Sequence, residues 1–492
     1  MMNSYPDIKK IATNAGSLFI NSIFRYLTSS IFVVILARYM GKTAFGKYSM
    51  AFALPSMLLF IPRMGFQKFI TREIANQNAK GSYILGNVLF LQFLLSIVAM
   101  LVLIGLSFLS YHDNSIRLLI FIAGISSLII SPIKNSSYGV FQGYERMSWI
   151  PLCDSLANSF VTIISIIAVL IGRGLLTILL LNLLGSIISS SISLAVVNYR
   201  FNTVKLYWDL KFWKRSIKIS GTFALSDLFS SVFTYFDVYL LSQIKGNEVV
   251  GLYSAASKLI LSLSIIPGAI MSAIFPNFAR MHFENSIYIS KTFEKSVQYL
   301  AMIAFPFGVG ITLFAEEIIT LLYGEQYYPS IQILRILSWV SVITFINWPL
   351  YDLLDATNRQ NKNLISCSLC SASNVIFNLV LIPHYGAIGA AIAFVGAYTI
   401  FLCSNYCFVK CSFPMFPFWS KIYKSILASV IMAIIMILFR VSSFYVNVIF
   451  AIFAYTTILL LVGGFGEEER VIVSKLYKYL FKYLFNIAKK RY

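Results

Sequence analysis

Residues 45–65 read "FGKYSMAFALPSMLLFIPRMG", and a similar stretch, "VGLYSAASKLILSLSIIPG", occupies residues 250–268. Both contain the pattern Gly-x-Tyr-Ser-x-Ala, which begins at Gly46 in the first copy and at Gly251 in the second. An Ile-Pro pair follows at the same distance in each copy. A segment that occurs twice in this form predicts two structurally related halves.

A second pair of segments repeats in the same order. "FQGYERM" at 141–147 matches "LDATNRQ" at 354–360, with Arg146 and Arg359 in register. Chance can produce one short match, but two matches in order at nearly equal offsets indicate an internal repeat. Parallel repeats are a known architecture of membrane transporters, in which the substrate site lies between the halves.

The composition identifies the broad class. Hydrophobic residues make up 58% of the chain and charged residues 12%, whereas soluble domains contain about 25% charged residues. Apolar stretches near 20 residues recur from end to end, as in polytopic membrane proteins. The net charge of +20 does not indicate nucleic-acid binding, because the basic residues gather in loops between spans. The cysteines and histidines match no metal-site or general-base pattern, so we expect no metal and no catalytic residues.

We predict an all-α membrane protein of about 14 transmembrane helices, in which two pseudo-symmetric six-helix lobes are followed by two C-terminal helices. The predicted organisation is an N-lobe at 1–199, a cytoplasmic amphipathic linker at 200–217, a C-lobe at 218–410, helices 13 and 14 at 411–465, and a basic amphipathic cytoplasmic tail at 466–492. The predicted spans are 14–37, 46–64, 84–110, 116–140, 149–171, 175–198, 218–244, 249–276, 297–322, 331–354, 362–382, 386–409, 422–440 and 444–464.

The distribution of Lys and Arg predicts the orientation. Basic residues are far more frequent in the loops on the N-terminal side and in the C-terminal tail than in the opposite loops. By the positive-inside rule, both termini are cytoplasmic. The linker and the tail also suit helices that lie on an anionic membrane surface, but we favour plain positive-inside anchoring as their explanation.

Charged residues inside predicted spans are the candidate site residues, because an ionised side chain near the bilayer centre normally faces a cavity or a counter-ion. Arg25 and Asn21 share one face of the first span with other polar residues, and Lys258 lies in the eighth span. Asp227 and Asp237 lie on the seventh span, and Asp154 on the fifth. Either these groups form structural ion pairs, such as Asp227 with Arg25 or Lys258, or the cations line a cleft for an anionic substrate. We favour the cleft.

Further candidates lie at the cytoplasmic end of span two. Arg63, Lys68 and Arg72 are placed to form an entry site for anionic headgroups, although membrane anchoring explains them almost as well. Asp154, Asp227 and Asp237 are candidates for coupling transport to Na⁺ or H⁺. No nucleotide-binding loop of the form Gly-x4-Gly-Lys-Ser/Thr occurs, so we expect no other cofactor and an ion gradient or the membrane potential as the energy source.

Three segments resemble the polysaccharide-biosynthesis flippases of the multidrug/oligosaccharidyl-lipid/polysaccharide exporter superfamily, which also contains lipid II flippases and MATE exporters. They are 37–75 ("ARYMGKTAFGKY…"), 314–339 ("FAEEIITLLYGEQYYPSIQILRILSW") and 353–393 ("LLDATNRQNKNLI…"). The resemblance implies a MATE-like fold with a central cavity. It also implies flipping of undecaprenyl-pyrophosphate-linked oligosaccharide repeat units to the outer face of the bacterial inner membrane.

The resemblance also implies roles for particular residues. In the lipid II branch, cavity arginines on the first and eighth helices serve the pyrophosphate. Arg25 occupies a similar place on span one, Lys258 falls where the eighth-helix arginine would be, and Arg63 corresponds loosely to an arginine near the end of the second helix. The partners implied are the lipid-linked oligosaccharide, membrane lipids and the polysaccharide polymerase machinery.

Four alternatives stay open at this stage. The alternatives to a surface-polysaccharide flippase are a lipid II flippase, a MATE-like drug or ion antiporter, a membrane enzyme such as a polysaccharide polymerase, and an assembly scaffold. The excess of cavity cations over carboxylates disfavours the antiporter. The absence of a large extracytoplasmic loop with paired acidic or His/Arg residues disfavours the enzyme. A scaffold would not need a polar, charged stripe on the first helix of each half.

Overall fold

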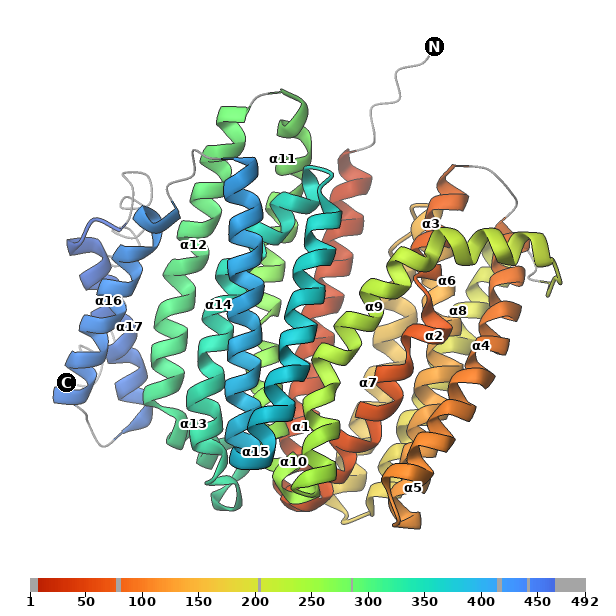
Figure 1. Cartoon of the computed structure of the whole chain (residues 1–492), viewed down its shortest axis with the longest axis horizontal. Helices are drawn as coiled ribbons and strands as arrows, with labels where there is room; N and C mark the ends of the chain where they lie inside the picture. The colour runs from red at the N-terminus through yellow and green to blue at the C-terminus, as the bar shows by residue number, and fades with distance from the viewer. Residues whose placement is uncertain are drawn as a thin grey trace, which may run out of the picture.

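The computed structural model of the chain describes residues 8–76, 81–201, 205–284, 286–413, 418–439 and 443–464. Long helices run up and down the molecule (Figure 1). The predicted tail at 466–492 lies outside the described residues. The first half contains α1 (Ile8–Leu58), α2 (Phe60–Arg63), α3 (Phe66–Ala75), α4 (Gly81–Ser110), α5 (Asn114–Gly124), the π-helix η1 (Ile125–Ile130), α6 (Ser131–Gly143), α7 (Trp149–Leu170) and α8 (Leu175–Phe201).

The second half follows a similar course and ends in two additional helices. It contains α9 (Leu210–Ile244), α10 (Asn247–Ser262), α11 (Ile265–Glu284), α12 (Ser286–Leu313), α13 (Ala315–Tyr323), the short 3₁₀ helix η2 (Glu325–Tyr327), α14 (Ser330–Ala356), α15 (Gln360–Ser412), α16 (Phe418–Leu438) and α17 (Phe444–Leu461).

Within the described residues, helices occupy most of each predicted span, but the number of crossings stays a prediction. Within the described ranges, nine helices are long and apolar enough to cross a bilayer, or ten if the bent pair Leu27–Leu58 and Phe60–Ala75 is one span. Two of the long helices each contain two predicted spans: α1 is kinked at Gly41 and α15 at Gly386.

Three boundaries differ from the prediction. The span predicted at 46–64 is divided between the end of α1 at Leu58 and α2, and the left-handed backbone of Met64 and Gly65 then separates α2 from α3. The span predicted at 297–322 is divided at Phe314, where α12 gives way to α13. Within the predicted linker, the part from Leu210 onward is the first part of α9, capped by the side chain of Asp209.

The turn between the first two helical segments is the same in both halves. Gly41 has φ 80° and Gly246 has φ 84°, a region that is open to glycine but strained for other residues. Gly41 and Gly246 are 205 positions apart, as are Gly46 and Gly251. The repeat detected in the sequence therefore extends back to the glycine that reverses the chain.

The second repeated landmark also has one backbone geometry in both halves. Glu145 and Asn358 both have positive φ, 54° and 59°. The amide that follows donates to the carbonyl five residues earlier, Arg146 to Phe141 and Arg359 to Leu354, each at 2.8 Å. These paired turns explain why Arg146 and Arg359 are in register.

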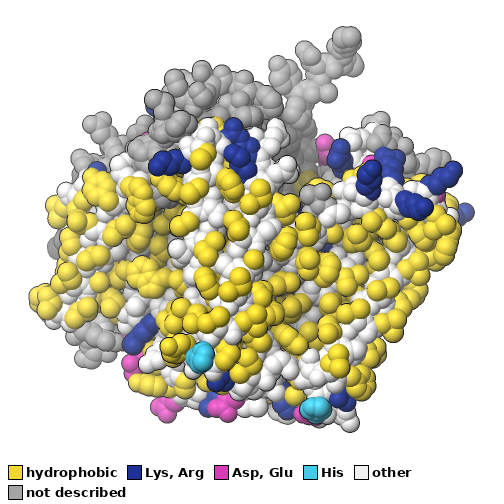
Figure 2. Space-filling view, in the orientation of Figure 1, with side chains coloured by type: hydrophobic (Ala, Val, Ile, Leu, Met, Phe, Trp, Pro, Cys, Tyr) yellow, Lys and Arg dark blue, Asp and Glu magenta, His cyan; other side chains and the backbone are white. Residues whose placement is uncertain are grey.

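The helices form two groups in Figure 1, with α2–α8 on the right and α10–α17 on the left. The ribbons of the two groups diverge toward the end where the N-terminus lies. At the opposite end a shared apolar core joins them, with Leu36, Met50 and Tyr253 among its fully buried members. Figure 2 shows hydrophobic side chains over the middle of the molecule and Lys and Arg gathered at its upper edge, as in a multi-pass membrane protein.

Candidate functional site

A polar cavity of about 260 Å³ lies in the first half, between α1, α7 and α8. Arg25 and Tyr48 line it from α1, Asn158 and Thr162 from α7, and Asn182 from α8. Most of the other lining groups are small or hydroxyl-bearing. The cavity therefore offers one cation together with amide and hydroxyl groups that can bind an anion or sugar hydroxyls.

Arg25 belongs to a charged cluster at this cavity. A nitrogen of its guanidinium lies 3.7 Å from Asp154 Oδ2, and its side chain is 54% exposed. Asp154 Oδ1 accepts hydrogen bonds from Lys134 at 3.1 Å and from Asn158 at 2.7 Å. Asp154 itself is 2% exposed. The Lys134 contact thus fixes the carboxylate more closely than Arg25 does, and two cations face one carboxylate.

The structure changes the interpretation of two sequence candidates. Asp154, predicted to couple ions, is bound to Lys134 and Asn158 and faces Arg25. Asn21 lies on α1 one turn before Arg25, but its side chain is outside the described ones. The alternative ion pair of Asp227 with Arg25 or Lys258 is absent among the described residues, and the charges that act on Asp227 are those of Arg63 and Lys68.

Lys258 lies apart from the Arg25 cavity, against rings of the other half. Its ammonium is 5.0 Å from the ring centroid of Phe45 and 5.2 Å from that of Tyr48. Among the described residues, no carboxylate lies within 4 Å of Lys258. Cation–π attraction therefore joins α10 to α1. Since Tyr48 also lines the cavity of Arg25, one ring contacts both environments.

The repeated tyrosines have different partners in the two halves. Tyr48 contacts the ring of Phe32 edge to face, at a centroid distance of 6.2 Å. Tyr253 donates a hydrogen bond to the buried carboxylate of Asp237. Phe32 and Asp237 are also 205 positions apart. Asp237, predicted as a coupling carboxylate, is therefore bonded within its own hairpin.

The cations at the end of the second span lie around the break between α2 and α3. Gly65 fits tightly against Phe223 of α9, because a Cβ built at Gly65 would lie 2.3 Å from Phe223 Cβ. Lys68 places its ammonium 4.9 Å from the centroid of the Phe223 ring. Arg63 and Lys68 also interact with Asp227 of α9, whereas Arg72 is exposed further along α3. The predicted entry site is thus partly a contact between α3 and α9.

The two halves are closed against each other at the end away from the N-terminus. Lys42 forms an ion pair with Glu248 at 2.7 Å. Arg38 donates to the carbonyl of Leu321 at 2.9 Å, and the Tyr327 hydroxyl donates to the carbonyl of Ala37 at 3.0 Å. These contacts link α1 with α10, α13 and η2 around the turns at Gly41 and Gly246.

Sequence reasoning missed Lys134, which is the cation nearest to Asp154. Lys134 lies inside the predicted span 116–140, so the criterion that selected Arg25 also selects it. It also missed Glu73, whose carboxylate binds Arg215 of α9 at 3.0 Å and ties α3 to the start of the second half. Within the described ranges no cluster of His, Cys, Asp or Glu fits a metal ion.

The up-and-down helices, the two related halves and the charged polar cavity define a membrane transporter fold. The family model described as "Polysaccharide biosynthesis protein" matches residues 11–282. The chain belongs to this family, which confirms the resemblance seen in the sequence.

Relatives and solved structures agree with this assignment. The chain is 24% identical over 392 residues to a Shigella flexneri protein described as "Putative O-antigen transporter", covering 76% of this chain and 92% of that protein. The lipid II flippase MurJ in an inward closed conformation has a TM-score of 0.78 at 17% identity, covering 90% of this chain and 97% of MurJ. An inward-facing MATE-family multidrug transporter has a TM-score of 0.64 at 16% identity, covering 80% and 94%.

These comparisons confirm the predicted fold class, an all-helical membrane protein with MurJ- and MATE-like architecture. The relatives are transporters and flippases, in agreement with the expectation that the chain is a transporter and not an enzyme.

Proposed function

We propose that the protein is a flippase that moves undecaprenyl-pyrophosphate-linked oligosaccharide repeat units across the bacterial cytoplasmic membrane during synthesis of a surface polysaccharide. Family membership supports transport in polysaccharide biosynthesis. The observation that carries the substrate proposal is the Arg25 cavity, whose lining cation is 54% exposed and shares the neighbouring buried carboxylate of Asp154 with Lys134.

The cavity chemistry suits both parts of such a substrate. The exposed guanidinium of Arg25 presents a planar array of donors that matches phosphate oxygens. Asn158, Thr162 and Asn182 supply amide and hydroxyl groups for sugar hydroxyls. The polyprenyl tail would remain in the lipid between the two groups of helices. Arg63, Lys68 and Arg72 would attract the headgroup at the α2–α3 break.

Transport would proceed by alternating access. The closed end, held by Lys42–Glu248 and Arg38–Leu321, would separate when the opposite end closes. Lys258 would lose its ring contacts in that step, which makes its ammonium a gate contact in one state and a ligand for pyrophosphate in the other. Asp227 is the first proposed coupling carboxylate for Na⁺ or H⁺, since Asp154 is held by Lys134 and Asn158 and Asp237 by Tyr253.

The proposed orientation places both termini in the cytoplasm. It rests on the concentration of Lys and Arg at the end where α1 begins. The flipped unit would then emerge at the end that carries Gly41 and Gly246, where a polysaccharide polymerase would receive it.

The test is transport of lipid-linked repeat units in inverted vesicles from a strain that lacks the gene. Vesicles containing the protein should translocate the units, and Arg25→Ala should reduce the rate at least tenfold at equal protein abundance. Arg173→Ala is the matched control, because this exposed arginine lies in the turn between α7 and α8, away from the cavity. Equal translocation with and without the protein would refute the proposal.

A further inference from the structure

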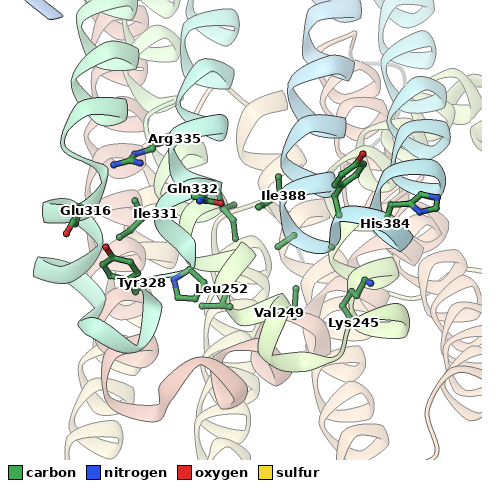
Figure 3. Close-up of a pocket in the computed structure, with 15 residues that line it drawn as sticks. Lys245, Val249, Leu252, Glu316, Tyr328, Ile331, Gln332, Arg335, His384 and Ile388 are labelled. Atoms are coloured by element: carbon green, nitrogen blue, oxygen red, sulfur yellow. The ribbon is translucent and has the colours of Figure 1, made fainter. Parts of the chain in front are cut away.

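A second groove, separate from the Arg25 cavity, opens on the surface of the second half. Its volume is about 590 Å³, within the range of ligand sites. Figure 3 shows its walls: Gln332 and Arg335 on α14, His384 and Ile388 on α15, and Lys245 at the end of α9. Val249 and Leu252 of α10 lie along its lower side. It lies at the end opposite the N-terminus.

The local backbone creates this groove. The left-handed turn at Gly386 interrupts α15 and opens a gap beside the first turns of α14. A Cβ built at Gly386 would lie 3.8 Å from the aliphatic part of Lys245, so the lysine chain lies over the kink. The kink and the turn before α10 thus place the ammonium at the mouth of the groove.

The groove is lined by more positively charged than negatively charged side chains. Lys245 and Arg335 line it together with one carboxylate, Glu316. Within the described ranges, neither Lys245 nor Arg335 has a carboxylate within 4 Å. Gln332 and His384 add further N–H donors. The groove therefore presents two unpaired cations and further N–H groups to a ligand.

The position of Arg335 along α14 indicates that the groove lies at the headgroup region of the bilayer. Arg335 follows Ser330, the first residue of α14, by five positions, which places it roughly 7.5 Å into an apolar helix. It is exposed, and Trp339, one turn deeper, is 41% exposed. Tyr328 and Tyr385 at the mouth are 57% and 62% exposed. Exposed Trp and Tyr at the end of a span mark the headgroup region of a bilayer.

We propose that this groove binds the phosphate of a lipid headgroup in the leaflet at the end opposite the N-terminus. Lys245 and Arg335 contact the phosphate oxygens, Gln332 and His384 donate hydrogen bonds, and the acyl chains lie along Ile388 and the exposed face of α14. The proposal does not depend on which substrate crosses the central cavity.

The test is lipid binding by the purified full-length protein, measured by native mass spectrometry with phosphatidylglycerol, phosphatidylcholine and undecaprenyl pyrophosphate as probes. Wild-type protein should retain phosphatidylglycerol several-fold more strongly than phosphatidylcholine. The double variant Lys245→Gln/Arg335→Gln should weaken this binding about tenfold, whereas Arg173→Gln, at the same end of the molecule, should not. Displacement of phosphatidylglycerol by undecaprenyl pyrophosphate assigns the carrier lipid as ligand, and persistence assigns bulk phospholipid.

Two results would overturn the proposal: equal retention of the anionic and zwitterionic lipids, or unchanged phosphatidylglycerol binding by the double variant. If the double variant does not fold, a photo-reactive benzoylphenylalanine at Gln332 replaces it. That side chain should crosslink to phosphatidylglycerol, and the same group at Tyr445, which is 66% exposed on α17, should not distinguish the two lipids.

Discussion

Gly46 and Gly251, the first residues of the repeated pattern, pack against each other's helices with no room for a side chain. A Cβ on Gly46 would lie 1.7 Å from the carbonyl oxygen of Asn247, and one on Gly251 would lie 1.9 Å from that of Lys42. The two copies of the motif are thus the place where the halves cross. Small residues at a helix crossing allow this close approach in membranes.

We predict that Gly46→Ala or Gly251→Ala destabilises the closed end. Each added methyl meets backbone and not a flexible side chain, so the expected loss is about 1–3 kcal/mol. Spin labels on α1 and α10 should report a wider distance between the helices by pulsed electron resonance. Gly105→Ala in α4 is the control, since nothing lies within 4 Å of a Cβ there. A distance unchanged from wild type in both variants would contradict the prediction.

Lys258 and Tyr48 should be energetically coupled. The ammonium lies 5.2 Å from the ring centroid of Tyr48, and such contacts contribute about 0.5–2 kcal/mol. Lys258→Met and Tyr48→Leu, made singly and together, form a double-mutant cycle read by thermal unfolding in detergent. We expect the two losses to be less than additive by about that amount. Full additivity would show that the cation–π contact has no energetic weight.

Substitutions of Lys134 and Arg25 should have different effects: the first should mainly lower stability and the second should mainly lower transport. Lys134→Met removes the 3.1 Å partner of a buried carboxylate, and breaking a buried pair in this way costs about 3–5 kcal/mol. Arg25→Met removes the longer and more exposed contact with Asp154. The free energy of unfolding should therefore fall much less, while the rate of translocation falls. The rescue variant Lys134→Met/Asp154→Asn should recover part of the lost stability. Greater destabilisation by Arg25→Met than by Lys134→Met would be the opposite of our expectation.

The cap of α9 should make stability sensitive to acid. Asp209 accepts a hydrogen bond from the Tyr83 hydroxyl at 2.6 Å and from the amides of Lys211 and Phe212. These bonds hold the pKa of Asp209 below its ordinary value, the Tyr83 bond most strongly. The contribution is therefore present above the ordinary pKa and is lost as pH falls through the lowered one. Thermal unfolding of Asp209→Asn should depend less on pH between about 5 and 3 than that of wild type. An unchanged pH dependence would argue against the cap.

The repeat could be recognised from sequence because its signals are local. Gly46, Tyr48 and their counterparts lie in helices, and the turns around Arg146 and Arg359 are set by a few consecutive residues. The contact partners of the charged residues inside the membrane could not be predicted from such local patterns. The contact of Lys258 with Phe45 and the binding of Asp154 to Lys134 depend on how distant helices pack, and spacing along one helix does not determine that packing.

The different partners of the repeated tyrosines have a mechanical consequence. The edge-to-face contact between Phe32 and Tyr48 contains no hydrogen bond, whereas the charge-assisted bond from Tyr253 to Asp237 holds α9 and α10 in register. The break around Met64 and Gly65 lies in the same half as the ring contact. We therefore expect the two parts of α1 on either side of Gly41 to shift against each other more than α9 and α10 do when the closed end opens.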